Sequence, residues 1–282
     1  MMTRPVRTAC AAVLLALAAA PGVAPGTANG ADVGLNDIRR LLAAGRFSDA
    51  AAAGEAEGSA QSLALAAQAL GYEARCRYRG DDAQQAALFT RAGELARRAT
   101  ALDETDALAW RQLARARGHL LEKDRGALSH AAAVAELGAV VDALDRAKAL
   151  DPADPETEMA LGVVEASKLV VSREALFGLF SVMGDREAAL QHFCLAARLA
   201  DRSDDPVGRV VVHTAIGNSL WRLDPDLYGG SAIRHLDEAL AACDGGHAVC
   251  ACIHEEVAEL RQSIAGAGAT GTSREDAEDC PR

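Results

Sequence analysis

Two arginines and a histidine recur at four-residue spacing near the middle of the chain: Arg111, Arg115 and His119. On a helix this spacing places the three side chains in a single stripe on one face. Guanidinium groups bind carboxylates and phosphates through paired hydrogen bonds, so the stripe predicts a site for an anionic group. The alternative is that these arginines are solvated or paired with neighbouring acids, as most charged helix faces are.

No set of residues predicts catalysis. The chain lacks a glycine-rich phosphate loop, a His-Glu-x-x-His pair and a nucleophile elbow, and its seven histidines are scattered. We therefore expect a protein that is not an enzyme and that needs no cofactor.

The N-terminus resembles a secretory leader. Arg4 and Arg7 precede an apolar run from Ala9 to Ala20, and a stretch rich in Pro, Gly and Ala follows. The run is shorter than the ~20 residues that span a bilayer, so we expect cleavage rather than a retained membrane anchor. The sequence thus predicts a signal peptide over residues 1–30 and a periplasmic or secreted protein with no membrane span after cleavage.

Six cysteines follow the leader, and an even number in an exported protein indicates disulfide bonds. Cys243 and Cys250 flank a Gly245-Gly246 turn between two expected helices, so we predict that these two pair. Cys252 lies about 200° around its helix from Cys250 and cannot share the bond.

The same segment permits a metal site as an alternative. Cys243 and His247 stand at i, i+4, as do Cys250 and His254, and both pairs suit a soft metal. The segment lacks any established zinc-site spacing, however, and the oxidising compartment favours the disulfide. We therefore predict no metal.

Composition indicates an all-α chain. Half of the 282 residues are apolar but only 4% are aromatic, and alanine supplies much of the apolar content. Alanine has the highest helix propensity and packs between close helices, whereas sheets favour β-branched and aromatic residues. The net charge of −11 argues against nucleic-acid binding.

A repeated triplet gives the register of the helices. Four times a small residue is followed four positions later by an apolar residue and three later by alanine, in Ala92/Ala96/Ala99, Val140/Leu144/Ala147, Ala189/Phe193/Ala196 and Ala232/Leu236/Ala239. Each triplet follows a pair whose second member is small: Leu70-Gly71, Leu113-Ala114, Leu161-Gly162 and Ile216-Gly217. A small residue lets two helices approach to roughly 8–10 Å.

These marks resemble the tetratricopeptide (TPR) repeat, whose first helix carries a Leu-Gly pair and whose second carries the triplet. The resemblance covers residues 35–264, and it implies an array of helical hairpins, an α-solenoid, within a domain over 31–265. A shorter first hairpin would begin near Leu35. A capping helix would run from about Ala248 to Ile264 with Glu255, Glu256 and Glu259 on its outer face, before a disordered acidic tail over 266–282.

The spacing departs from the family inside the central hairpins. The steps from pair to triplet exceed the TPR pattern by 14 and 15 residues in the second and third hairpins. Either the helices are longer, or a short extra helix forms at the turn, as Ala131 to Leu137 with Gly138 as its stop would allow. The apolar stretch Leu169 to Met183 is expected to be core under a long helix.

Two narrower resemblances are present. The run Trp110 to Ala116, with Ala149 to Pro152, is similar to the helical domain of the regulator of microtubule dynamics family, which implies an apolar or lipid-like ligand pocket. Tyr228-Gly229-Gly230 is similar to the last repeat of the periplasmic TPR component of TRAP-type transporters, which implies a solute-binding protein as partner.

The TPR resemblance implies that the first helices form an inner groove. Its lining would be Arg111, Arg115 and His119 on one helix and Thr214, Asn218, Trp221 and Arg222 on another. We therefore expect a scaffold that binds a protein partner in this groove. The alternative is a carrier for a small acidic or apolar ligand.

Overall fold

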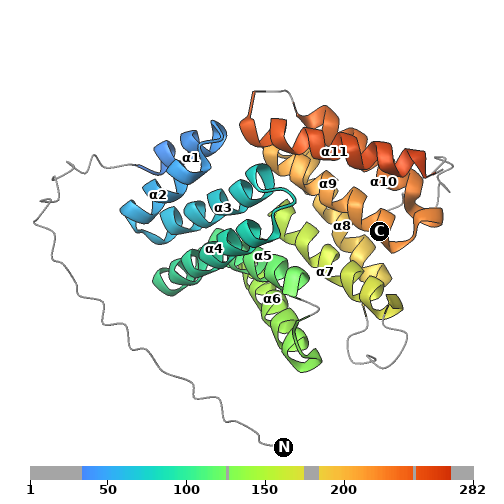
Figure 1. Cartoon of the computed structure of the whole chain (residues 1–282), viewed down its shortest axis with the longest axis horizontal. Coiled ribbons are helices and arrows are strands. Elements are labelled where there is room, and N and C mark those ends of the chain that lie inside the picture. The colour runs from blue at the N-terminus through green and yellow to red at the C-terminus, as the bar shows by residue number, and fades with distance from the viewer. Residues whose placement is uncertain (1–33, 125–126, 175–183, 244–245, 268–282) are drawn as a thin grey trace, which may run out of the picture. The chain divides into compact units, whose positions relative to one another are not determined.

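Eleven helices, and no strand, make up the part of the chain that a computed structural model describes: residues 34–124, 127–174, 184–243 and 246–267. They are α1 (Leu35–Ala43), α2 (Phe47–Glu57), α3 (Ala60–Arg77), α4 (Asp82–Leu102), α5 (Ala107–Asp124), α6 (His130–Leu150), α7 (Pro155–Glu174), α8 (Arg186–Asp201), α9 (Pro206–Leu223), α10 (Pro225–Ala242) and α11 (Ala248–Gly266). The all-α fold class is confirmed (Figure 1). Within these ranges no helix combines the length and the apolar character needed to cross a bilayer.

Consecutive helices pack against each other as hairpins: α3 with α4, α5 with α6, α7 with α8, and α9 with α10. The sequence provides the starts of these helices. The side chains of Ser59, Asp81, Ser129, Asp185 and Asp224 each accept a hydrogen bond from a backbone N–H of the first turn that follows. Such caps satisfy donors that the helix itself leaves unpaired.

The four triplets all lie on the second helix of a hairpin, and every triplet residue is buried. In the last two hairpins the glycine of the preceding pair faces the triplet. A Cβ at Gly162 would lie 2.6 Å from the Phe193 ring, and one at Gly217 would lie 2.9 Å from Leu236. In both hairpins the glycine is therefore needed because the large triplet residue occupies the space beside it.

The extra residues of the second hairpin lengthen its helices instead of forming a separate one. Ala131 to Leu137 form the first turns of a continuous α6, so a short extra helix over those residues is wrong. Gly138 lies exposed inside α6 and does not end a helix. The apolar residues 175–183 of the third hairpin lie outside the described residues, as do the expected signal peptide and nearly all of the expected tail.

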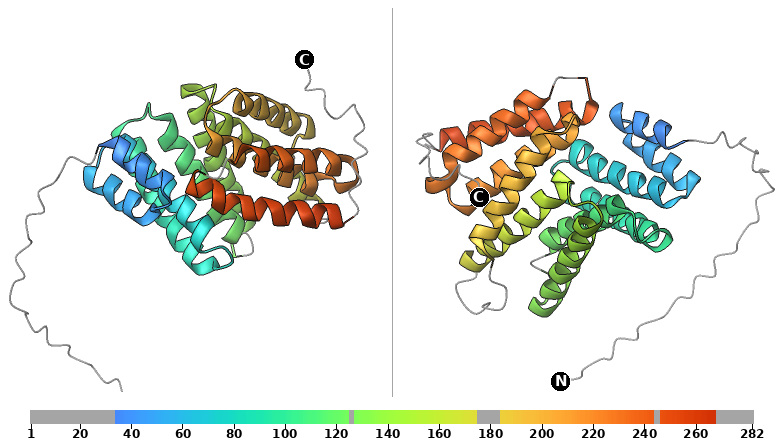
Figure 2. Two further views of the ribbon diagram at one scale, coloured as in Figure 1. Left: turned by 90° about the horizontal axis from the view of Figure 1, so that it is seen from above. Right: turned by 180° about the vertical axis from the view of Figure 1, so that it is seen from behind.

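The first hairpin and the last helix agree with the expected bounds, and they contact each other. Helix α11 packs on α9 and α10 and also contacts α1 and α3 (Figures 1 and 2). Gly45, in the turn between α1 and α2, has φ +71°, and a Cβ there would lie 2.7 Å from that of Ala248. Both the left-handed backbone and the close approach of α11 require glycine at this turn.

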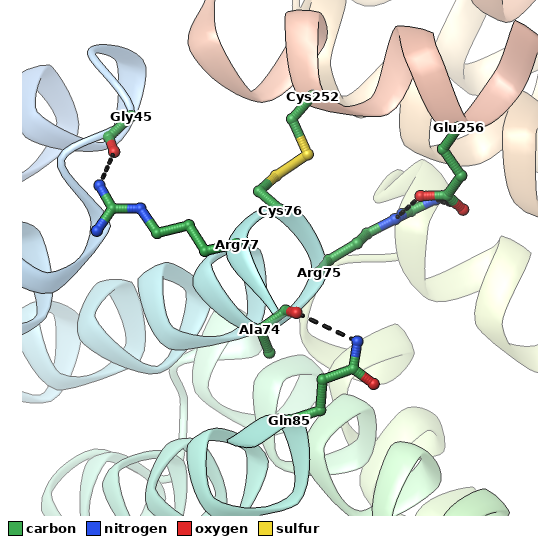
Figure 3. The surroundings of a disulfide bond; sticks show 8 residues. All are labelled: Gly45, Ala74, Arg75, Cys76, Arg77, Gln85, Cys252 and Glu256. Atoms are coloured by element: carbon green, nitrogen blue, oxygen red, sulfur yellow. Dashed lines mark hydrogen bonds and ion pairs between the residues drawn. A yellow bond between two sulfur atoms is a disulfide. The ribbon is translucent and has the colours of Figure 1, made fainter. Parts of the chain in front are cut away.

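A disulfide between Cys76 of α3 and Cys252 of α11 joins residues 176 positions apart (Figure 3). The predicted pairing of Cys243 with Cys250 is therefore wrong. Cys250 is fully buried in the first turn of α11 beside Val249, whereas Cys243 is half-buried at the end of α10. The face of α11 that carries Cys252 is the one that meets α3.

Ion pairs flank the disulfide, one from α3 itself and one from the turn that follows it. The Arg75 guanidinium donates from Nε and Nη2 to the two carboxylate oxygens of Glu256, both at 2.9 Å (Figure 3). One turn further on, Arg79 pairs with Glu259. The bidentate geometry and partial burial of the first pair make it stronger than an exposed ion pair. Together these contacts fix α11 against α3.

Replacing both Cys76 and Cys252 with serine should lower the free energy of unfolding by about 2–5 kcal/mol, because the long loop between them is no longer closed in the unfolded chain. Guanidinium unfolding of the purified protein measures the change. Cys243→Ser is the matched control and should leave the midpoint unchanged. Equal midpoints for all three proteins would contradict the stabilising role of this bond.

Gly162→Ala and Gly138→Ala should change stability in opposite directions. The methyl group at Gly162 enters the Phe193 ring, and we expect a loss of about 1–3 kcal/mol from overpacking. The methyl group at Gly138 meets open space, so the higher helix propensity of alanine should raise stability by up to about 1 kcal/mol. Thermal unfolding of the two variants provides the test, and a shift of the same sign in both would contradict the packing described.

Candidate functional site

Arg111, the first residue of the predicted stripe, is paired with acids at the start of α7. Its Nη1 lies 2.5 Å from Asp154 Oδ1, and its Nη2 lies 3.6 Å from Glu156 Oε1. All three side chains are at most 14% exposed. Burial alone would lower the pKa of Arg111, but Glu156 and Asp154 outweigh burial and raise it. For Arg111 the alternative of pairing with neighbouring acids therefore holds.

Arg115, one turn along α5, lies over an aromatic ring. The centre of its guanidinium is 5.1 Å from the ring centroid of Tyr72 on α3, which is a cation–π contact. Burial and the nearby Glu156 raise the pKa of Tyr72, while Arg115 and Arg111 oppose the rise. Nη1 of Arg115 is buried and has no acceptor within the described residues. Nη1 of Arg115 is thus still able to donate a hydrogen bond to a ligand, but one face of the guanidinium is covered by the Tyr72 ring.

His119 completes the stripe as a neutral ring. It stacks on Phe89 of α4, with ring centroids 4.2 Å apart and planes 18° from parallel. Burial, with the positive charges of Arg115, Arg75 and Lys123, lowers the pKa of His119 to about 3. The stripe is therefore not a row of three available cations: one is neutralised, one is stacked and the third carries no charge at neutral pH.

The four predicted groove residues on α9 differ in how far they are exposed to solvent. Thr214 is buried, and its hydroxyl donates to the Val210 carbonyl at 2.6 Å, so the expectation that it lines a groove is wrong. Asn218 and Trp221 are half-buried. Arg222 is 44% exposed, and its Nη1 lies 3.8 Å from Glu122 Oε1 at the end of α5. The Arg222–Glu122 contact thus brings the ends of α5 and α9 together. Thr214 is part of the interior and is not available to a ligand.

Asn218 lines a pocket of about 350 Å³ between α9, α3 and α11. The other lining residues are Arg79, in the turn after α3, and Glu256, Glu259, Leu260 and Ser263 of α11. We call this space the inner pocket. The sequence predicted Glu256 and Glu259 on the outer face of the last helix, so it did not predict that they line this pocket. In the structure both carboxylates face α3 and pair with its arginines.

The inner pocket carries charges of both signs. Arg79 pairs with Glu259 and Arg75 with Glu256, so neither sign is in excess. Burial would raise the pKa of Glu256, but the hydrogen bonds and charge of Arg75 hold it below its ordinary value. Asn218 adds an amide, which donates and accepts hydrogen bonds. A pocket with this lining suits a ligand that has both donors and acceptors, such as a peptide segment.

Two other polar networks hold helices in place. Glu158 of α7 is 1% exposed and lies 2.8 Å from Lys148 Nζ of α6 and 2.7 Å from His192 Nδ1 of α8. Burial raises the pKa of Glu158, but these two hydrogen bonds and charges give a net lowering. The charged carboxylate is thus kept in the interior by two partners.

The second network is a chain of three groups. His213 Nε2 of α9 lies 3.1 Å from Asp201 Oδ1, and its Nδ1 lies 2.9 Å from His235 Nδ1 of α10. Burial, with the charges of His213 and Arg234, lowers the pKa of His235 to about 3. In the part of the chain that the structure describes, no group of three or more His, Cys, Asp or Glu side chains is arranged to hold a metal ion.

The low pKa of His119 makes stability depend on pH. In the folded protein the His119 ring stays neutral down to about pH 3. In the unfolded chain the same ring takes up a proton near pH 6.5. The contribution of His119 to stability should therefore be constant above about pH 6.5 and fall as pH drops below it. Chemical unfolding at pH 7 and pH 5 should show a smaller loss for His119→Phe, which keeps the ring stack but does not titrate.

The control for this comparison is His254→Gln, because His254 is exposed on α11. Its pH dependence should equal that of the unsubstituted protein. If His119→Phe also retains the full loss between pH 7 and pH 5, His119 is not a neutral buried ring.

Comparison with known proteins gives no family for this chain. No protein-family model matches it, and no curated protein matches it either. The evidence for function is therefore the geometry of the inner pocket and of the helices that hold it.

Proposed function

We propose that this chain is a non-enzymatic, exported scaffold of TPR-like hairpins that binds a protein partner through its inner pocket. The observation that carries the proposal is the composition of that pocket. Its walls come from α9, α11 and the turn after α3, and the disulfide and the Arg75–Glu256 ion pair hold α3 and α11 together. A site whose walls are fixed before binding loses less entropy when a partner binds.

The side chains around the inner pocket suit a protein segment. Trp221 is half-buried on α9 and stands three residues from Asn218, close to one helical turn. Tryptophan and arginine are the residue types most often responsible for affinity in protein interfaces. Arg222, 44% exposed beside Trp221, is the cation of the predicted groove that remains accessible to a partner.

Export is supported by two features of the chain. The N-terminal sequence has the order of charged, apolar and small residues typical of a secretory leader. The Cys76–Cys252 disulfide is consistent with an oxidising compartment, because cytosolic thiols are normally kept reduced. We therefore propose the periplasm or the extracellular space as its location.

A carrier for a small ligand is the second candidate, and the volume of the inner pocket favours it. About 350 Å³ falls at the lower end of the range for small-molecule sites. Arg79 would supply a cation for an acidic ligand, in exchange for its present pair with Glu259. The two candidates use the same pocket and differ in what fills it.

Selection from a phage-displayed peptide library tests the scaffold. The purified protein should enrich peptides with a common motif, and Asn218→Arg should weaken their binding by tenfold or more, because the larger side chain fills the pocket. Glu238→Lys, at an exposed position on α10, is the control and should bind like the original protein.

A carrier for a small ligand would give a different set of results. If no peptide motif is enriched, while organic acids or lipids raise the thermal midpoint and Asn218→Arg removes that shift, the protein is a carrier. Native mass spectrometry of the purified protein would then show the retained small molecule. Absence of peptide enrichment, ligand shift and retained mass together would contradict both candidates.

A further inference from the structure

A second cleft lies over α5, between the second helices of two neighbouring hairpins. Helices α4 and α6 both pack on α5, and both run antiparallel to it. Lys123 near the end of α5 pairs with Asp82 at the start of α4. The Arg146 guanidinium near the end of α6 donates to the Glu104 carbonyl at the turn before α5, at 3.4 Å. The space between α4 and α6 over α5 has a volume of about 400 Å³, and we call it the α4–α6 cleft.

The floor of this cleft is apolar. Leu113, Leu120 and Leu121 of α5 line it, and Leu128 closes one end. Leu113 is 9% exposed, whereas the other three are half-buried. From Leu113 to Asp124 the cleft extends over roughly 16 Å of α5, which is the length of about three helical turns.

The first half of α6 lacks the packing of its second half. Its buried residues begin at Val140, the middle residue of the helix, and end at Ala147. Before them, Ala131, Ala135 and Gly138 are exposed, and a Cβ at Gly138 would meet no atom within 4 Å. Glu136, in these turns, lines the cleft, and the open space at Gly138 leaves room for a further neighbour.

Charges on the rim of the cleft are separated along its length. Arg97 of α4 and Arg117 of α5 lie toward the end marked by Leu113, and Asp124 and Glu136 lie toward the opposite end. No ion pair within the described residues engages Arg97, Arg117 or Glu136. The cleft therefore has a basic end and an acidic end around an apolar floor. Glu94, one turn from Arg97 on α4, offsets part of the positive charge of the two arginines at the basic end.

We propose that the α4–α6 cleft binds an amphipathic α-helix of a protein partner, about three turns long. Apolar residues at i, i+4, i+7 and i+11 of such a helix would cover the leucines of the floor. Helices commonly carry acids in their first turn and bases in their last, because these complement the helix dipole. A partner helix of this kind places its first turn at Arg97 and Arg117 and its last turn at Asp124 and Glu136, so it runs antiparallel to α4 and α6.

This surface is separate from the inner pocket, because the two share no residue and the inner pocket is lined by α9, α11 and the turn after α3, without α5. The two sites allow the chain to hold two partners at once. The second site does not depend on the first, since a helix can bind in the cleft whatever the inner pocket holds.

A charge exchange tests the cleft. The probe is a fluorescein-labelled, hydrocarbon-stapled peptide of about 14 residues, with glutamates in its first turn, leucines at the four apolar positions and lysines in its last turn. A second peptide carries the same leucines with the charges exchanged. Fluorescence anisotropy with the full chain should show the first peptide binding about tenfold more tightly than the second.

The variant Arg97→Glu/Arg117→Glu should reverse that preference, so that the exchanged peptide becomes the tighter one. Arg98→Glu, the exposed neighbour on α4, is the matched control and should keep the original preference. If the double variant loses its helical circular dichroism, Arg97→Glu alone should reduce the preference by about half on a logarithmic scale. Asn218→Arg should bind both peptides as the original protein does, which separates this site from the inner pocket.

Three results would overturn the proposal. One is the absence of saturable anisotropy with either peptide up to about 1 mM. Another is equal binding of both peptides, which would show that the rim charges do not act. The third is self-association of the chain in sedimentation velocity that Arg97→Glu/Arg117→Glu removes, since the occupant would then be a second copy of this protein.

Discussion

The contact between α3 and α11 is the constraint on which the array depends. A helical hairpin buries its apolar face only against a neighbour, so the first and last members of a series have a side with no partner. Here those two ends cover each other, through the bond from Cys76 to Cys252 and the Arg75–Glu256 pair. The turn at Gly45 meets the start of α11 for the same reason. With few aromatic residues, the chain has few large apolar side chains to bury. Covering the ends of the array removes further apolar surface from water.

Buried ionic groups recur where successive hairpins meet. Arg111 joins α5 to the start of α7, Glu158 joins α7 to α6 and α8, and His213 joins α9 to α8 and α10. Alanine-rich surfaces slide past one another easily, because alanine offers little shape to interlock. A buried polar group whose partners lie on neighbouring helices favours the one register that brings them together. We interpret the three networks as the source of that specificity in this structure.

The hairpin register could be predicted from the sequence because its determinants are local. Gly162 and Phe193, or Gly217 and Leu236, belong to one hairpin, and the step between them is readable along the chain. The disulfide could not be predicted, because its cysteines are 176 residues apart and the nearer pair looked equally good. The walls of the inner pocket were missed for the same reason. Only the closure of α11 on α3 turns Glu256 inward.

The error at Thr214 has a different cause. A first helix of an open repeat presents one face to solvent, and the predicted groove assumed this for α9. In the structure α9 packs against α7, α8, α10 and α11, and its middle is buried on all sides from Val210 to Thr214. The pattern of apolar residues there, with three consecutive valines, is that of a helix with no free face. Asn218 and Trp221 follow Thr214 by one and two turns of α9. Both are half-buried, so the fully buried part of the helix ends before them.

The contact between His213 and His235 fixes the hydrogen positions of both rings. A carboxylate can only accept, so the Nε2 atom of His213 carries the hydrogen that Asp201 receives. In its neutral form His213 then has a bare Nδ1, and the hydrogen between the two rings belongs to His235. Asp201 is 58% exposed, yet it determines the tautomer of a ring that is 2% exposed and, through that ring, of a second one. One surface carboxylate thereby sets the direction of a hydrogen-bonded chain that crosses three helices.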